Sequence, residues 1–252
     1  LMKIDFPIEI TTFADVPAGS GLGSSSSFAV GLMNALYALK GQLVTKYTLA
    51  ESAARIEIEI LKRTMGKQDH YAAAYGDLNV LTFHVNENVT VEPVFYSSEV
   101  HQKIASNLLL FYTTKKRNAS EILKVQDQVT PNKLSVLRQM KNLVEPLREV
   151  ILSGENLHQV GEILHENWEL KRSLTDLTSS KEIDKCYLKA LQAGAIGGKL
   201  LGAGGGGFLI FYVEPDKHDS VIKALSSLYH LKFRFDTSGT RITYYDQSTF
   251  YD

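Results

Sequence analysis

The sequence predicts an α+β fold, because strand-like and helix-like segments are grouped along the chain. A strand, a loop rich in glycine and serine, and two helices come first, and a pair of strands follows. A long helical region then leads to a closing β–α–β unit, a grouping typical of α+β proteins. With 252 residues, 44% of them hydrophobic and 22% charged, the chain is long enough to bury a sizeable core.

The first predicted element is a strand from 3 to 13, in which apolar and polar residues alternate. Ile4, Phe6, Ile8 and Ile10 would share one face, which indicates a strand with one side buried. Because this strand begins almost at the first residue, we expect further chain to precede it in the intact protein.

Two helices are predicted next. The apolar, alanine-rich stretch 28–39 ends just before Gly41, and glycine commonly follows a helix end. The second helix is predicted over 48–62, where Thr48 and Glu51 resemble a capping box at its start.

The rest of the chain contains short strands around a long helical region. Apolar runs between turn-forming residues predict strands at 78–83, 89–95, 108–113, 208–213, 232–235 and 241–245. A turn joins the first two of these strands. Helical spacing predicts helices through 119–193, with breaks near Pro131, Gly154 and Ser179, and another helix at 216–229.

The loop before the first helix is the strongest chemical signal in the sequence. Residues 19 to 27 contain three glycines and five serines and lead directly into that helix. Glycine lets the backbone approach an anion closely, and the first N–H groups of a helix have no partner within it. Together they can cradle a phosphate, and a serine hydroxyl can serve as a Mg²⁺ ligand. A flexible loop ending in a capping serine is the alternative.

This loop differs from two common nucleotide-binding motifs. No Gly-Lys-Ser/Thr follows at the spacing of a Walker loop, and the glycines do not match G-x-G-x-x-G. The loop resembles the ATP-binding signature of the GHMP kinases, in which a proline is followed by Gly-Leu-Gly-Ser-Ser and a small residue. The resemblance implies that the triphosphate of ATP is bound by Pro17, Gly19, Ser20, Gly21, Leu22, Gly23, Ser24, Ser25 and Ser26. It also implies Ser25 as a Mg²⁺ ligand, with Ser24 as the alternative because the run of four serines leaves the alignment open.

Three carboxylates lie where phosphoryl transfer could use them, as metal ligands or beside the attacking hydroxyl. Glu57 and Glu59 are two residues apart on the second predicted helix, so they face about 200° apart and only one can point into a given site. Asp69 follows in the run Gly66-Lys67-Gln68-Asp69-His70-Tyr71. From residue type alone, solvated glutamates and a helix-capping aspartate are the more common outcome.

The run 66–76, Gly-x-Gln-Asp-x-Tyr-Ala-Ala-Ala-Tyr-Gly, resembles the heptose and fucose kinase branch of the same family. The resemblance implies Asp69 as the catalytic base beside the acceptor hydroxyl and Glu57 as a Mg²⁺ ligand, with Glu59 as the fallback. Lys67 is a second predicted catalytic residue, which would either contact the transferred phosphoryl group or lower the pKa of Asp69. A solvated Lys67 is the alternative.

A second glycine-rich stretch precedes the strand predicted at 208–213. Four consecutive glycines, 204 to 207, imply close packing of the backbone against a ligand or a neighbouring loop. The stretch resembles the C-terminal glycine motif of GHMP kinases, which packs beside the active site. We therefore expect Gly204, Gly205 and Gly206 to contact substrate.

Two basic clusters are candidates for holding a substrate phosphate, because a phosphate dianion needs arginine or lysine. Charge runs such as Lys115-Lys116-Arg117 and Lys171-Arg172 are most often solvated. Their surroundings resemble segments of the heptose-phosphate kinase branch, which makes Arg117 and Arg172 the predicted substrate-binding residues.

Composition narrows the class of partner. A net charge of −1 argues against nucleic-acid binding through bulk positive charge, and no apolar run approaches the roughly 20 residues that span a membrane. The lone cysteine, Cys186, can form neither an intrachain disulfide nor a multi-cysteine metal site. We expect a cytoplasmic protein that binds a small-molecule sugar or sugar phosphate, with no nucleic-acid or membrane partner. A homodimer is compatible with the sequence.

The family resemblance extends over essentially the whole chain and implies two domains. It predicts the GHMP kinase fold, with an N-terminal ATP-binding domain of the ribosomal-protein type at 1–115 and a ferredoxin-like C-terminal domain at 116–252. Complete family members begin with a sugar-binding segment that nothing here matches. We therefore expect the N-terminal strands of the fold to be missing from this chain.

The resemblance implies transfer of the γ-phosphoryl group of ATP, with Mg²⁺, to a sugar hydroxyl. The expected acceptor is the anomeric hydroxyl of D-glycero-D-manno-heptose 7-phosphate, which would give the 1,7-bisphosphate. A fucokinase-like sugar 1-kinase and a non-catalytic sensor or binding protein with the same fold are the alternatives.

Overall fold

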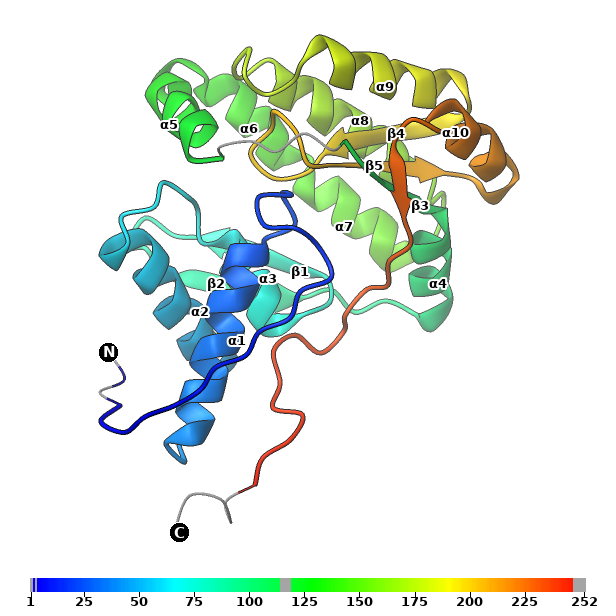
Figure 1. Ribbon diagram of the computed structural model, residues 1–252. Helices are drawn as coiled ribbons and strands as arrows, with labels where there is room; N and C mark the ends of the chain where they lie inside the picture. The colour runs from blue at the N-terminus through cyan, green and yellow to red at the C-terminus, as the bar shows by residue number, and fades with distance from the viewer. Residues whose placement is uncertain (1, 3, 114–118, 247–252) are drawn as a thin grey trace.

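The computed structural model describes residues 2, 4–113 and 119–246. Figure 1 shows two packed halves: a small sheet with three helices near the chain start, and a larger sheet with further helices. The combination of helices with separate antiparallel sheets confirms the predicted α+β class.

The N-terminal half packs three helices around small side chains. These helices are α1 (Ser24–Leu39), α2 (Lys46–Arg55) and α3 (Gln68–Tyr75). Four alanines are among the buried residues of this core, and their small side chains let the helices lie close together. The helix α2 continues directly into a π-helical turn, η1 (Ile56–Ile60). Such turns are frequent at functional sites.

A hairpin completes this half, as predicted from two apolar runs joined by a turn. The strands β1 (Asn79–Phe83) and β2 (Val89–Pro93) pair antiparallel along their whole length.

The C-terminal half is built on a four-stranded sheet in the order β4-β5-β3-β6, in which all neighbours are antiparallel. The central strand β5 is apolar throughout and almost fully buried, as expected for a strand covered on both faces. The strands are β3 (Leu108–Tyr112), β4 (Ala195–Leu200), β5 (Phe208–Val213) and β6 (Tyr229–Leu231). The accompanying helices are α4 (Ser98–Asn107), α5 (Ala119–Val129), α6 (Leu134–Asn142), α7 (Val144–Ser153), α8 (Gln159–Arg172), α9 (Lys181–Gln192) and α10 (His218–Ala224).

The helix α8 lies close against β4 because glycines face each other where the two cross. A Cβ on Gly197 would lie 2.0 Å from the carbonyl oxygen of Gly161, and a Cβ on Gly161 would lie 2.8 Å from the Ile196 side chain. Backbones can approach this closely only at glycine. The strand β4 is not apparent from the sequence, because the pair Gly197-Gly198 resembles a loop when its packing partner is unknown.

The strand predicted for residues 4 to 13 does not form. Within the described chain no strand pairs with this segment, and a strand is stable only when its backbone is paired. Ile4 is half-buried, but the apolar side chains of Phe6, Ile8, Ile10 and Phe13 are exposed, from 39% for Ile8 to 94% for Phe13. The alternating pattern is therefore real, but it has no neighbour to pack against in the described residues.

Helix boundaries differ from the prediction where capping decides them. The side chain of Thr45 accepts a hydrogen bond from the N–H of Thr48, so Thr45 rather than Thr48 caps α2. The helix α4 was not predicted, and the helix predicted at 216–229 shortens to α10. Among the described residues, no helix combines the length and the apolar character needed to cross a membrane.

The two strands predicted near the C-terminus are also wrong. Residues 232–246 instead leave the large sheet and run along the N-terminal half (Figure 1). Asp77 donates its N–H to the carbonyl of Asp236 at 2.7 Å, and Thr240 donates to the carbonyl of Ala73 at 2.9 Å. These single bonds go to the end of α3 rather than to a strand, so no ladder forms. The domain division at 115 and 116 stays a prediction.

We expect Gly197→Ala to lower the free energy of unfolding by about 1–3 kcal/mol, the usual cost of extra atoms in a packed site. The matched control is Gly31→Ala, because Gly31 is exposed in α1 and an added Cβ would meet no atom within 4 Å. The control should be neutral or stabilise by up to about 1 kcal/mol. Urea unfolding measures both, and equal stabilities would contradict the close packing of α8 on β4.

Candidate active site

Three glycines shape the loop before α1. Gly19, Gly21 and Gly23 have φ angles of 76°, 87° and 66°, which other residues rarely adopt. Gly23 precedes the first residue of α1, where no described side chain caps the helix and its first turn holds no acidic residue. The first N–H groups of α1 can therefore receive an anion, which the helix dipole would favour.

Two serines of this loop are buried with unused hydroxyls. Ser20 and Ser26 are each 1% exposed, and within the described part of the chain neither Oγ has a hydrogen-bond partner. A buried hydroxyl without a partner costs about 1–3 kcal/mol. The arrangement fits a ligand with several acceptor oxygens, such as a polyphosphate.

Asp69 lies directly against this loop. It is in the first turn of α3, and a Cβ added to Gly23 would come within 3.2 Å of the Asp69 Cβ and Cγ and 3.3 Å of its Oδ2. Burial raises the pKa of Asp69, although the Gln68 amide and nearby His70 act against the shift. The structure thus brings together the two motifs on which the kinase hypothesis depends.

Glu57 meets the same loop from the π-helical turn η1, with only 2% of its surface exposed. Its Oε1 accepts a hydrogen bond from the Ser25 hydroxyl, and its Oε2 pairs with His70 Nε2 at 2.8 Å. The Arg63 guanidinium also contacts Glu57 Oε1. Burial raises the pKa of Glu57, but the Ser25 and His70 hydrogen bonds and the charges of His70 and Arg63 outweigh it, and the net shift is downward.

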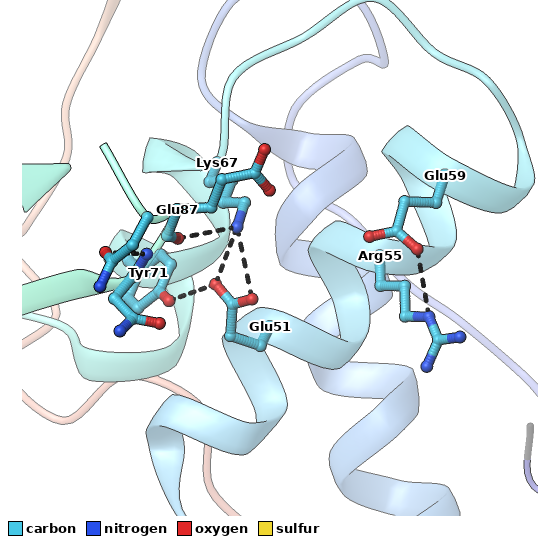
Figure 2. Close-up of polar contacts among 8 residues, drawn as sticks. Glu51, Arg55, Glu59, Lys67, Tyr71 and Glu87 are labelled. Atoms are coloured by element: carbon cyan, nitrogen blue, oxygen red, sulfur yellow. Dashed lines mark hydrogen bonds and ion pairs between the residues drawn. The ribbon is translucent and has the colours of Figure 1, made fainter. Parts of the chain in front are cut away.

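Glu59 points away from the loop, as the spacing of the two glutamates predicted. Its Oε2 pairs with Arg55 Nε at 3.2 Å, and both side chains are mostly exposed (Figure 2). Of the two glutamates, Glu57 is therefore the one that can serve this site.

The second glycine loop packs on the first. A Cβ on Gly207 would lie 2.1 Å from the carbonyl oxygen of Ser20. Thr113, which follows β3, holds Gly207 in place: its N–H donates to the Gly207 carbonyl at 2.8 Å, and its Oγ1 accepts from the Gly207 N–H at 3.1 Å. The predicted packing of glycine backbone against a neighbouring loop is thus observed at Gly207.

Both halves of the chain are similar to known proteins. The family models described as "GHMP kinases N terminal domain" and "GHMP kinases C terminal" match residues 1–77 and 140–231. The D-glycero-alpha-D-manno-heptose 7-phosphate kinase of Campylobacter jejuni is 31% identical over 246 residues, which cover 95% of this chain and 71% of that protein. The chain belongs to the GHMP kinase family.

Other relatives agree on the family and differ in substrate. The galactokinase of Pyrococcus furiosus is 29% identical, over 87% of this chain and 68% of its own length. A crystal structure of a D-glycero-D-manno-heptose 1-phosphate kinase from Bacteroides thetaiotaomicron superposes with a TM-score of 0.65 at 28% identity. The match covers 90% of this chain and 64% of that one, so this chain spans about two thirds of its length. GHMP kinases use ATP as phosphate donor, and these relatives confirm the predicted fold.

Lys67 does not lie against Asp69 in this GHMP kinase. Figure 2 shows its Nζ directed at Glu51, 3.4 Å from each carboxylate oxygen, and at the Glu87 carbonyl, 3.3 Å away. Tyr71 donates its hydroxyl to the same Glu51. The expectation that Lys67 lowers the pKa of Asp69 is therefore wrong, because Lys67 is paired elsewhere and that pKa is raised. A contact of Lys67 with a phosphoryl group stays a prediction.

The glycines predicted to bind substrate are held by the segment between α8 and α9. The N–H of Gly205 donates to the Thr178 carbonyl at 2.8 Å, and a Cβ on Gly204 would lie 2.7 Å from that same oxygen. Gly206 is buried beside them. Lys171 supports the stretch as well, since its Nζ donates to the carbonyl of Leu200 at 3.1 Å. Substrate contact by Gly204, Gly205 and Gly206 stays a prediction.

Arg172 is engaged by two carboxylates. Its guanidinium lies 2.9 Å from a Glu169 oxygen and 3.3 Å from an Asp184 oxygen. Arg117, the other predicted substrate-binding arginine, lies outside the described residues. Phosphate binding by either arginine stays a prediction.

The residues of the site fit a nucleotide with Mg²⁺. The unused hydroxyls of Ser20 and Ser26 and the free helix end suit the phosphates. Ser25 and Glu57 offer two adjacent hard oxygens for the metal. No group of three or more His, Cys, Asp or Glu that could hold a metal occurs in the described ranges, so phosphate and water oxygens would have to complete the shell.

Sequence reasoning missed two members of this site, His70 and Arg63. Both contact Glu57, but Arg63 lies outside the predicted motifs and His70 occupies an unspecified position of the run 66–76. Position alone could have suggested them, because both lie in or beside the stretch between the two predicted carboxylates.

We expect Gly207→Ala to destabilise the protein and to weaken nucleotide binding, because the new Cβ would force Gly207 away from Ser20. The control is Gly41→Ala: Gly41 also has a positive φ, 66°, but an added Cβ meets nothing within 4 Å. The control should lose only the strain of a left-handed residue, about 1–2 kcal/mol. Thermal unfolding and titration with a fluorescent ATP analogue measure the two effects. Unchanged nucleotide affinity in Gly207→Ala would contradict a role of the loop contact in the site.

Proposed function

We propose that this chain carries the active site of an ATP-dependent sugar kinase. The proposed acceptor is the anomeric hydroxyl of D-glycero-D-manno-heptose 7-phosphate, and the product is the 1,7-bisphosphate. The observation that carries the proposal is the contact of Asp69 with Gly23, which sets a carboxylate beside the glycine–serine loop at the start of α1. Phosphoryl transfer depends mostly on such positioning and on charge stabilisation.

The first loop would bind the phosphates of ATP. Backbone N–H groups at the start of α1 and the hydroxyls of Ser20 and Ser26 supply the donors. Ser25 and Glu57 would hold Mg²⁺, which would neutralise part of the phosphate charge when bound. His70 keeps the Glu57 carboxylate oriented through its Oε2.

Asp69 would accept or orient the proton of the acceptor hydroxyl. Burial raises the pKa of Asp69, which makes its carboxylate a better proton acceptor than that of an exposed aspartate. The carboxylate of Glu57 has the opposite shift and remains charged, as a metal ligand requires.

The choice of acceptor rests on the relatives rather than on the described side chains. The relative with 31% identity is named for heptose 7-phosphate, and the solved structure with 28% identity is named for heptose 1-phosphate. A neutral sugar is the rival acceptor, and the double pairing of Arg172 with Glu169 and Asp184 favours it. An arginine that is already neutralised binds a phosphate less readily.

We expect Asp69→Asn to lower turnover by about 10²–10⁴-fold, the usual contribution of a general base. The same variant should be as stable as the wild type or more stable at neutral pH. Because the pKa of Asp69 is raised in the folded state, its stabilising contribution exists at acidic pH and is lost as the pH rises through that pKa. The charged form of Asp69 is disfavoured in the folded state, so replacing it with an uncharged amide removes this unfavourable contribution to stability.

Turnover and urea unfolding at neutral pH test this pair of effects. Glu59→Gln is the control, because Glu59 is exposed and paired with Arg55 away from the loop, and both quantities should stay unchanged. Turnover unaffected by Asp69→Asn would remove the base assignment. A loss of turnover that comes with a loss of stability would point to a structural role.

A coupled assay with ATP and a panel of acceptors tests the substrate. We expect the whole protein to phosphorylate heptose 7-phosphate, and Arg172→Ala to raise KM for it on the order of tenfold, the effect of one lost charge-assisted hydrogen bond. Turnover of fucose or galactose that is insensitive to Arg172→Ala would favour the neutral-sugar rival. No turnover of any sugar would contradict the proposal.

A further inference from the structure

The side chain of Arg63 lies on the two oxygens proposed above for Mg²⁺. Its Nη1 is 2.5 Å from Ser25 Oγ and also contacts Glu57 Oε1. A Mg²⁺ ion held by these atoms would lie about 2.0–2.1 Å from each of them. The guanidinium nitrogen and the metal would therefore contact the same two oxygens, where their positive charges repel each other, so the two should compete for this place.

This position suits a cation because Glu57 is a buried charge. Its side chain is only 3% exposed, and a buried carboxylate without a partner is strongly unfavourable. His70 pairs with Oε2 at 2.8 Å, and Oε1, which accepts the Ser25 hydroxyl, can take a cationic partner as well. Arg63 supplies that partner, and Mg²⁺ would supply it equally well.

Arg63 can leave this position without unfolding anything around it. Its side chain is 48% exposed and comes from the loop between η1 and α3. Its backbone N–H donates to the Glu57 carbonyl at 2.9 Å, which keeps its main chain close to the site while the side chain turns outward. Glu57 has no such freedom, because His70 and the Ser25 hydroxyl hold it from two sides.

A displaced Arg63 would remain beside the phosphates of a bound nucleotide. Ser25 is in the first turn of α1, at the helix end that suits those phosphates. Guanidinium groups bind phosphate through paired, charge-assisted hydrogen bonds. In phosphoryl transfer an arginine at the transferred group stabilises the charge of the transition state.

We propose that Arg63 exchanges between two anionic partners, binding Ser25 and Glu57 when no metal is bound and a nucleotide phosphate when Mg²⁺ takes its place. Arg63 is then a further phosphate-binding residue of the kinase and also the internal competitor of its metal. The inference rests on the proposed function, because it requires Ser25 and Glu57 to form the metal site.

Arg63→Gln tests the exchange because it removes the charge and keeps a polar side chain. Binding of Mn²⁺ alone, followed by the electron paramagnetic resonance signal of the free ion, should become several-fold tighter once the competitor is gone. Binding of Mn²⁺ with a non-hydrolysable ATP analogue, followed by calorimetry, should become weaker by about tenfold, the effect of one lost charge-assisted hydrogen bond. Arg55→Gln is the control, because Arg55 pairs with the exposed Glu59, and neither affinity should change.

Opposite changes in the two affinities are the signature of exchange. A residue that only keeps the loop in shape would weaken both, so weaker or unchanged Mn²⁺ binding in Arg63→Gln overturns the inference. An unchanged affinity for the nucleotide analogue overturns it as well.

Glu57→Gln separates this failure from a failure of the proposed function. If Glu57→Gln leaves Mn²⁺ binding unchanged, the metal site itself is wrong. If it abolishes Mn²⁺ binding while Arg63→Gln has no effect, the metal site stands and only the exchange is wrong.

Discussion

The site depends on a backbone contact between two loops that are far apart in the sequence. Gly207 approaches the carbonyl of Ser20 so closely that no side chain could stand between them. Thr113 fixes Gly207 from the other side, through hydrogen bonds to its N–H and its carbonyl. Because Thr113 and Gly207 border paired strands of the large sheet while Ser20 precedes α1, this contact joins the two halves at the point where the phosphates would bind.

Two carboxylates near this contact carry opposite pKa shifts, and the cause is their different set of partners. Both are desolvated, which raises the pKa of each. Glu57 receives hydrogen bonds from Ser25 and His70 and the charge of Arg63, and these outweigh burial. Asp69 receives a long hydrogen bond from the Gln68 amide, 3.5 Å, and the opposing charge of His70, and these do not outweigh burial. Neighbouring carboxyl groups with divergent pKa values commonly divide the tasks of a site, which agrees with the proposed roles of Glu57 as a metal ligand and Asp69 as a proton acceptor.

The sequence predicts what is local and misses what depends on distant contacts. The glycine–serine loop, α1 and β5 follow from glycine chemistry and apolar runs, and the helical spacing of Glu57 and Glu59 correctly indicates that they face apart. The strand β4 and the partners of Lys67 could not be predicted, since close packing on Gly161 and pairing with Glu51 are set by the tertiary fold. In the segment before the loop, the alternating pattern is typical of a strand. No strand forms there, because no strand of the described chain pairs with it.

The helix α3 connects the proposed chemistry to the large sheet, because different parts of the chain hold its two ends. Its first turn carries Asp69 and His70, which meet the first loop and the buried glutamate. Just beyond its last residue, Gly76 packs on the C-terminal segment, where an added Cβ would come within 2.2 Å of the Gly239 nitrogen. In this segment Asp236 accepts hydrogen bonds from the backbone N–H groups of Ser238 and Gly239, and these bonds hold the pKa of Asp236 below its usual range. Since this segment comes directly from the large sheet, its hydrogen bonds tie the end of α3 opposite the proposed base to that sheet.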